Sequence, residues 1–218
     1  MEQKQFSIWQ TLKISFHQTI EHLGLFLAVT VLQLALSIAL VAAAALWMIF
    51  LGRTVPIPLT IGVMALLGTA LIMSMGWFSL AWTSICLEIE AHDASSMKTV
   101  WDCLHKFPTL RAMTLLTLIF GILRTILFCL LIVPGIWFDA VYSFAFFYLV
   151  ERHASATTSL KASAQMTKGI RLKLMGLFAV LALIEMIGHM TVIGGLLVAP
   201  WITMAALHVY RIMTDNRA

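Results

Sequence analysis

Three ionisable residues, Arg124, Asp139 and Glu185, lie inside stretches of sequence that are otherwise apolar. An unpaired charge at the centre of a membrane helix costs about 2.5 to 3.5 kcal/mol, so each residue needs a partner or water. A guanidinium beside carboxylates can form charge-assisted hydrogen bonds, take part in proton handling or hold the charged group of an anionic lipid. We therefore expect a polar site in which Arg124 faces Glu185 or Asp139, and which either carries function or only fixes the register of the helices.

The elements that position these residues are long apolar segments. Of the 218 residues, 61% are apolar and 11% are charged, whereas a soluble domain is about 45–50% apolar and about 25% charged. Uncharged stretches run from His22 to Gly52 and from Thr54 to Leu87, and each exceeds the roughly 20 residues that cross a bilayer. The sequence therefore predicts an all-α polytopic membrane bundle of about six transmembrane helices, organised as one integral membrane domain over residues 1–218.

Two glycine-containing turns, the first of which also contains a proline, divide the second half of the chain. The expected spans are residues 24–51, 59–87, 110–133, 136–151, 174–193 and 195–210. Pro134-Gly135 and Gly194-Gly195 are the expected turns of two tight helical hairpins near the outer surface. Since the fourth span is short for a hydrocarbon core of about 30 Å, residues 110–151 either cross fully or form a shallower re-entrant hairpin.

The positions of these turns predict how deep the ionisable residues lie. Arg124 lies nine residues before Val133 and Glu185 nine before Gly194, or about 13 Å along a helix. Asp139 lies only five residues after Pro134, so we expect it at about half that depth.

Lysine and arginine residues indicate the orientation of the chain. With the amino terminus inside, only Arg53 of the 14 lysine and arginine residues falls on the outer side, and Arg124 falls within a span. This bias predicts a multi-pass protein of a bacterial inner membrane with both termini in the cytoplasm.

Three segments that would lie at the inner surface have the spacing of amphipathic helices: residues 6–20, 97–107 and 154–168. Each precedes a predicted hairpin, and alignment of Leu12, Leu104 and Leu160 suggests a threefold repeat of interfacial helix plus hairpin. The units would be residues 1–92, 93–151 and 152–218. Gly62, Gly68 and Gly76 can allow close contact between helices.

Five basic residues and no acidic one lie in the segment from Arg152 to Lys173. They are Arg152, Lys161, Lys168, Arg171 and Lys173. Such a cluster either is only the topology signal of an inner-membrane protein or binds anionic lipid or an acidic partner protein.

Motifs of catalysis are missing from the sequence. There is no phosphate-binding glycine loop, nucleophile elbow or histidine-rich metal signature, so we expect no enzyme, no cofactor and no metal. Basic residues are not interleaved with aromatic residues in a soluble domain, so nucleic acid is not an expected partner. Cys86, Cys103 and Cys129 form no Cys-x-x-Cys pair and predict no disulfide framework.

An ordered set of short motifs runs through the second half of the chain. Residues 133–137 read Val-Pro-Gly-Ile-Trp, residues 147–151 Phe-Tyr-Leu-Val-Glu, residues 159–163 Ser-Leu-Lys-Ala-Ser, and Lys168-Gly169 follows. From about residue 80 onward the chain thereby resembles a broad bacterial family of uncharacterised six-helix inner-membrane proteins. That family is related to the membrane domain fused to some glycerophosphodiester phosphodiesterases. The resemblance implies a membrane module with no catalytic residues to carry over.

Two functions fit these observations. The first is a non-enzymatic membrane module that organises lipids or partner proteins at the cytoplasmic face. Its partners would be membrane lipids, anionic ones included, a membrane protein or a second copy of the chain. The alternative is a small transporter or lipid-handling protein that uses the buried Arg124, Asp139 and Glu185.

Overall fold

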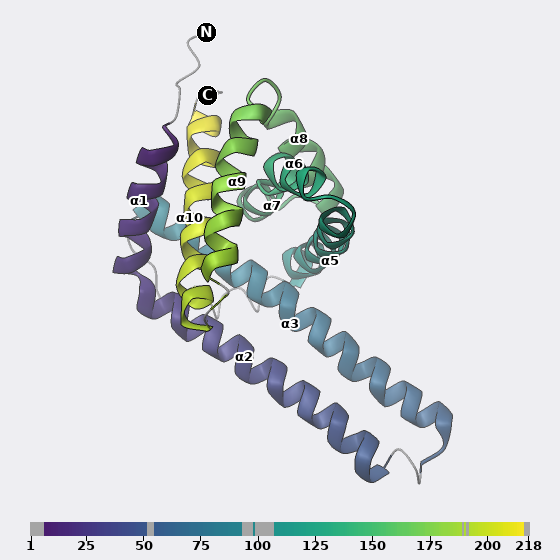
Figure 1. Ribbon diagram of the computed structural model, residues 1–218. Helices are drawn as coiled ribbons and strands as arrows, with labels where there is room; N and C mark the ends of the chain where they lie inside the picture. The colour runs from purple at the N-terminus through teal and green to yellow at the C-terminus, as the bar shows by residue number, and fades with distance from the viewer. Residues whose placement is uncertain are drawn as a thin grey trace.

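The described part of the chain is all-helical. The computed structural model describes residues 7–51, 55–92, 98, 107–188, 190 and 192–215, and none of them forms a strand. In chain order the helices are α1 (Ile8–Glu21), α2 (Leu23–Leu46), the π-helix η1 (Trp47–Leu51), α3 (Ile57–His92), α5 (Phe107–Leu130), α6 (Ile132–Tyr142), α7 (Ala145–Arg152), α8 (Ala156–Met166), α9 (Arg171–Gly188) and α10 (Val192–Asp215) (Figure 1). The predicted all-α class is confirmed.

Among the described residues, four helical stretches are long and apolar enough to cross a membrane. They are Leu23–Phe50, Ile57–Ala91, Pro108–Leu130 and Ile132–Arg152. These correspond to the first four predicted spans, although a turn at Ser143 and Phe144 separates α6 from α7 in the fourth. The fifth and sixth predicted spans fall on α9 and α10, which are not among the four. A total of six spans therefore stays a prediction.

Neighbouring helices pair into hairpins: α2 with α3, α5 with α6, and α9 with α10. Two of the three predicted amphipathic segments are helices, α1 and α8, and each precedes one of these hairpins along the chain. The remaining segment, residues 97–107, lies almost entirely outside the described residues. The threefold repeat itself stays a prediction.

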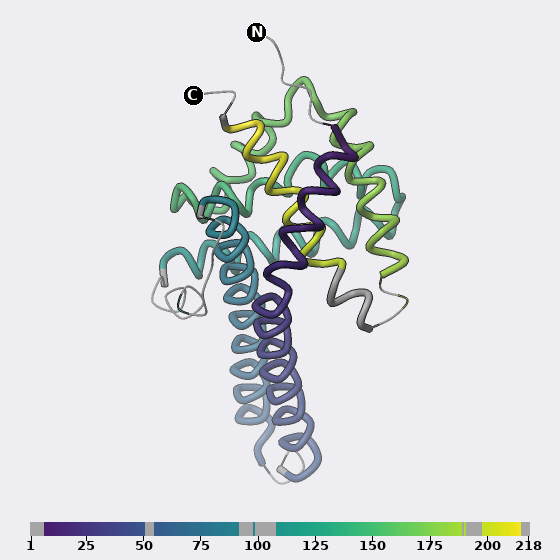
Figure 2. The backbone as a smooth tube through the Cα atoms, turned by 90° about the vertical axis from the view of Figure 1, so that its left-hand side faces the viewer, coloured from purple at the N-terminus to yellow at the C-terminus, as the bar shows by residue number. Residues whose placement is uncertain are grey.

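The α2–α3 hairpin extends well beyond the rest of the molecule (Figures 1 and 2). Phe26 and Val29 are the buried residues of α2, and the buried residues of α3 begin at Ser74. Beyond them the surface is apolar, and Ile38 and Leu66 are 66% and 70% exposed. Large apolar patches of this kind are unusual on soluble monomers and suit contact with lipid or another apolar partner.

The main hydrophobic core lies where α3, α5, α7, α9 and α10 meet, on the bundle side of that hairpin. The large side chains that are fully buried there include Leu80, Ile85, Met113, Leu116, Phe144, Leu177 and Tyr210. Helix α1 lies against α10, where the indole N–H of Trp201 donates to the carbonyl oxygen of Leu12 at 3.0 Å.

The predicted amphipathic helix at the amino terminus buries Leu12 but leaves most of its other apolar residues exposed. Helix α1 buries Thr11, Ser15 and Thr19 and leaves Trp9 81% exposed. The hydroxyls of Ser15 and Thr19 donate to backbone carbonyls one turn earlier, at 2.8 and 2.7 Å, so the buried polar face is satisfied within the helix. Phe16 packs edge-to-face on Trp201, whereas the outward position of Trp9 suits contact with a membrane surface.

The structure corrects the predicted hairpin turns. Pro134 and Gly135 lie in the first turn of α6, and the break from α5 is the single extended residue Leu131 (φ −162°, ψ 139°). A proline is tolerated in a first turn because the amide there has no intrahelical partner in any case. Likewise Gly194 and Gly195 lie within α10, which begins at Val192.

Helix α3 packs closely on α5 at Gly76, and a substitution there tests this packing. A Cβ atom at Gly76 would lie 2.8 Å from the backbone Cα of Thr114, whereas a Cβ at Gly68, on the protruding part of α3, would meet nothing within 4 Å. We expect Gly76→Ala to force the helices apart and lower stability by about 1 to 3 kcal/mol. Gly68→Ala is the matched control and should be neutral or mildly stabilising. Thermal unfolding in detergent measures both, and equal midpoints for the two variants would refute this packing.

Candidate functional site

The α5–α6 hairpin brings Arg124 and Asp139 together. Arg124 lies seven residues before the break at Leu131 and Asp139 eight residues after it, or about 10 to 12 Å along each helix. The two side chains therefore come to nearly the same level. The turn expected at residues 133–135 had put them out of register, so the prediction that Asp139 lies at half the depth of Arg124 was wrong.

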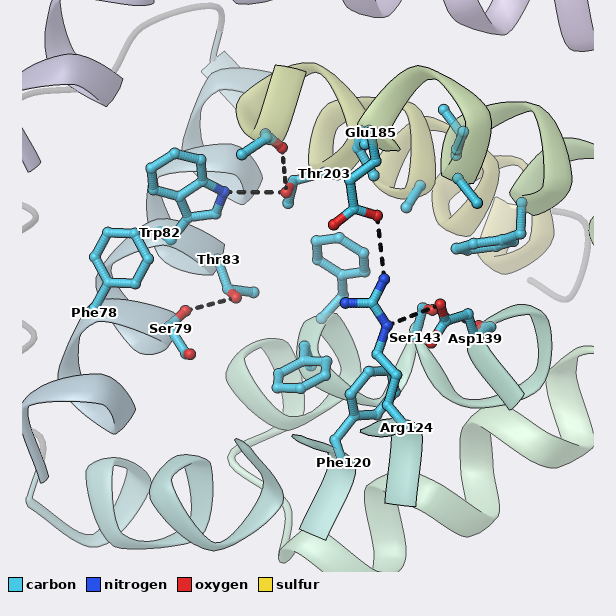
Figure 3. Close-up of a pocket in the computed structure, with 18 of the residues that line it drawn as sticks. Phe78, Ser79, Trp82, Thr83, Phe120, Arg124, Asp139, Ser143, Glu185 and Thr203 are labelled. Atoms are coloured by element: carbon cyan, nitrogen blue, oxygen red, sulfur yellow. Dashed lines mark hydrogen bonds and ion pairs between the residues drawn. The ribbon is translucent and has the colours of Figure 1, made fainter. Parts of the chain in front are cut away.

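Glu185 joins the pair from α9. The Nε of Arg124 donates to Oδ2 of Asp139 at 3.0 Å, and Nη2 donates to Oε2 of Glu185 at 3.1 Å. Figure 3 shows the guanidinium of Arg124 between the two carboxylates. All three residues expected to form a polar site thus form one cluster, which joins α5, α6 and α9; we call it the ion cluster.

The members of the ion cluster differ in burial. The side chain of Asp139 is 10% exposed, whereas those of Glu185 and Arg124 are 32% and 37% exposed. The second carboxylate oxygen of Asp139, Oδ1, is buried and has no hydrogen-bond partner among the described residues. The guanidinium also lies over the ring of Phe128, 5.4 Å from its centroid. One positive and two negative groups share the cluster, so its formal charge is −1 when all are ionised.

The ion cluster forms part of the wall of a cavity of about 390 Å³. The lining residues are Thr30 of α2; Phe78, Ser79, Trp82 and Thr83 of α3; Phe120 and Arg124 of α5; Asp139 of α6; Ser143; Phe146 and Phe147 of α7; Phe178, Leu181, Ala182 and Glu185 of α9; and Ala199, Ile202, Thr203 and Ala206 of α10. Because these come from all three hairpins, the cavity lies where the hairpins meet. Arg124 also borders a second hollow together with Thr125, Phe128 and Cys129.

Six of the described residues that line this central cavity are aromatic, and the sequence analysis assigned none of them to a site. Trp82 and Phe78 lie on the wall across from Arg124 in Figure 3, and their ring centroids are 5.1 Å apart. The indole N–H of Trp82 donates to Oγ1 of Thr203 at 3.1 Å, which fixes the ring. The sequence signal was weak, since aromatic residues four apart on an apolar helix are typical of ordinary packing.

The five basic residues of the inner segment do not form a single exposed patch. Arg152, Lys161 and Lys168 are exposed, whereas Arg171 and Lys173 are half-buried. Nη2 of Arg171 donates to the carbonyl oxygen of Ala164 at 3.0 Å, and its guanidinium lies 5.9 Å from the ring centroid of Trp137. Arg171 therefore serves the fold, and three exposed cations remain for contacts with lipid or protein.

A second polar group near the carboxyl end of α10 was not predicted. Glu90 of α3 lies 3.6 Å from Nδ1 of His208 and accepts a hydrogen bond from Gln18 of α1 at 3.4 Å. Arg211 donates to Glu151 of α7 at 2.7 Å. These contacts tie α10 to α3 and α7, and α3 to α1. The residues lie near the predicted inner ends of spans, where charges are common and their pairing is not visible in sequence.

No family model matches this chain, and neither a curated protein nor a solved structure matches it. The resemblance to the family of inner-membrane proteins therefore stays a prediction, and function is argued from the site.

The unequal burial of the two carboxylates predicts unequal effects of amide substitutions. Asp139→Asn should lower stability by about 1 to 3 kcal/mol, because the buried acceptor of the Arg124 hydrogen bond loses its negative charge and becomes a neutral amide oxygen. Glu185→Gln should cost less, because that pair is more exposed and better screened. Both variants keep the shape of the side chain, and thermal unfolding in detergent compares them. An equal or larger loss for Glu185→Gln would contradict this ranking.

Proposed function

We propose that this chain is a multi-pass protein of a bacterial inner membrane and that its central cavity binds a lipid or another amphiphilic small molecule. The observation that carries the proposal is the position of the ion cluster on the wall of a cavity of about 390 Å³ where three hairpins meet. Ligand pockets in proteins are typically about 300 to 1,000 Å³ and combine apolar walls with a few polar groups. Intramembrane ionisable residues commonly mark such sites.

Three features support the membrane placement. Four helical stretches have the length and composition of membrane spans, and the protruding α2–α3 hairpin is covered with exposed apolar side chains. Helix α1 begins and α10 ends at the same end of the molecule (Figure 1), as a topology with both termini in the cytoplasm requires. In this proposal α9 and α10 supply the fifth and sixth spans.

We favour binding or transport over catalysis at this site. Both carboxylates accept hydrogen bonds from Arg124, an arrangement that holds a charge in place and activates no nucleophile. The fixed charges and the aromatic wall are the features of a recognition site.

Filling the cavity tests the proposal. Ala182 lines the cavity, whereas its neighbour Leu183 is 57% exposed on the outside of α9. We expect native mass spectrometry of the protein, extracted from its own membrane, to show a bound small molecule. Ala182→Phe should lose that molecule because the new ring occupies its space, and Leu183→Phe should keep it. Adducts that are the same in both variants would contradict a ligand in this cavity.

A second candidate function is the organisation of anionic lipid at the inner surface. It is favoured by the three exposed cations Arg152, Lys161 and Lys168, and by the exposed apolar face of α1, on which Trp9 is 81% exposed. A basic residue near an anionic membrane gains about 1 kcal/mol. In this second candidate function the protein is a membrane module, and the cavity has no role.

Liposomes of defined charge test this second candidate. The double variant Lys161→Gln and Lys168→Gln should reduce the thermal stabilisation given by anionic lipid and leave stability in zwitterionic lipid unchanged. If wild type is equally stable in the two kinds of liposome, specific interaction with anionic lipid is excluded.

A further inference from the structure

One nitrogen of the Arg124 guanidinium has no partner on the wall of the central cavity. Its Nε donates to Asp139 and its Nη2 to Glu185, whereas Nη1 makes no hydrogen bond within the part of the chain that the structure describes. The side chain of Arg124 is 37% exposed and lines the cavity. In Figure 3 this third nitrogen is turned toward the wall that carries Trp82. Nη1 is therefore a donor that a ligand in the cavity can reach.

Several other donors on the described wall already have acceptors. The hydroxyls of Thr30, Thr83 and Thr203 donate to backbone carbonyl oxygens one turn earlier, at 2.8, 2.7 and 3.0 Å. The indole N–H of Trp82 donates to Thr203. Nη1 of Arg124 has no such acceptor, and an N–H of a charged group that lies unpaired against apolar surroundings costs free energy. A ligand that brings an acceptor oxygen to Nη1 removes this cost.

The acceptor on the ligand need not be charged, because Asp139 already balances the charge of Arg124. The two side chains form an ion pair at 3.0 Å, and that of Asp139 is only 10% exposed. An anion at Nη1 would lie on the same guanidinium as this buried carboxylate and would be repelled by it. A neutral carbonyl oxygen accepts the same N–H without that repulsion. The ion pair therefore favours a carbonyl group over a carboxylate or a sulfonate.

The aromatic residues of the wall suit a ligand with an aromatic ring. Phe78 and Trp82, and likewise Phe120 and Phe146, have ring centroids 5.1 Å apart. Aromatic rings pack on one another in offset or edge-to-face arrangements at such distances. A cavity of about 390 Å³ has room for a small aromatic molecule. Because Phe78 and Trp82 lie across the cavity from Arg124 in Figure 3, a ring that packs on them can direct its carbonyl group toward Nη1.

We propose that the central cavity binds neutral aromatic carbonyl compounds, in which the carbonyl oxygen accepts a hydrogen bond from Nη1 of Arg124 and the ring packs on the aromatic residues of the wall. This inference rests on the proposed function, since it names the chemical class of the ligand that the cavity binds. Two kinds of molecule share this chemistry. One is a membrane lipid that carries such a ring, and the other is a free aromatic ketone dissolved in the membrane.

Three probes of nearly the same shape isolate the carbonyl oxygen. They are the ketone acetophenone, the hydrocarbon α-methylstyrene, in which a methylene group replaces the oxygen, and the anion benzoate. Binding is measured by equilibrium dialysis against the full-length protein in lipid nanodiscs, and empty nanodiscs correct for partition into lipid. One hydrogen bond to a charged donor predicts that acetophenone binds about 10-fold more tightly than the hydrocarbon. Equal affinities, or tighter binding of either α-methylstyrene or benzoate, overturn the inference.

A fourth probe distinguishes the two sources of the ligand. Octanophenone has the same ring and carbonyl group as acetophenone and adds an alkyl tail. After correction for partition, tighter binding of octanophenone supports a lipid as the ligand, whereas equal or weaker binding supports a free ketone. Either result supports the chemical class.

A double variant tests whether Arg124 supplies the hydrogen bond. Arg124→Met with Asp139→Asn removes the donor together with its buried partner, so neither charge of this pair is left unpaired. Affinity for acetophenone should fall about 10-fold, to that for α-methylstyrene, which should itself change little. Arg211→Met with Glu151→Gln is the matched control, because it removes a 2.7 Å ion pair whose two residues are not among the described residues that line the cavity. If the two double variants behave alike, the assignment to Arg124 is overturned.

The carbonyl stretching band of the ligand gives a readout that needs no variant. A hydrogen bond to the guanidinium should lower the stretching frequency of isotope-labelled acetophenone relative to the same molecule in empty nanodiscs. Infrared difference spectroscopy on wild type measures this shift, so the inference stays testable if the Arg124 variant does not fold. An unshifted band for the bound molecule overturns the hydrogen bond.

The outcomes keep this inference distinct from the proposed function. If acetophenone and α-methylstyrene bind alike, or no probe binds while wild type still carries an adduct that Ala182→Phe loses, the cavity is a binding site but does not select carbonyl compounds. If no probe binds and no adduct is found, both proposals fail.

Discussion

The cost of placing charges in apolar surroundings is the constraint on which the arrangement of this chain depends. Arg124 cannot lie within an apolar helix of the bundle without partners, and it has two, Asp139 and Glu185, from two other helices. The ion cluster thereby fixes the register of α5 against both α6 and α9. It also places all three side chains on the wall of the central cavity, so the contacts that define the packing also form part of the candidate site.

The protein has an unusual distribution of apolar residues, because many of them are on the outside. The α2–α3 hairpin buries only its bundle-side part, and α1 turns small polar residues inward and aromatic residues outward. Inside, large side chains fill the core, and Gly76 against Thr114 lets α3 and α5 approach closely. This is the pattern expected when hydrocarbon, in place of water, surrounds most of the helical surface.

Much of this architecture could be predicted from the sequence, and the failures have identifiable causes. Long uncharged stretches predicted the apolar helices because length and hydropathy are local properties. The grouping of Arg124, Asp139 and Glu185 followed from the cost of isolated charges. The turn was misplaced because Pro134 and Gly135 are common turn residues, yet here the proline occupies a helical first turn after Leu131. The aromatic wall was not predicted, since it is assembled from α3, α5, α7 and α9, and such distant contacts leave no local pattern.

A double-mutant cycle between Arg124 and Asp139 tests the central claim most directly. Stability in lipid nanodiscs is measured for Arg124→Gln, Asp139→Asn, the double variant and wild type. The contacts described here predict a coupling free energy of about 1 to 3 kcal/mol, whereas a cycle between Arg124 and the distant Glu21 should give less than about 0.5 kcal/mol. A coupling between Arg124 and Asp139 no larger than that of the distant pair would contradict the ion cluster and the cavity built on it.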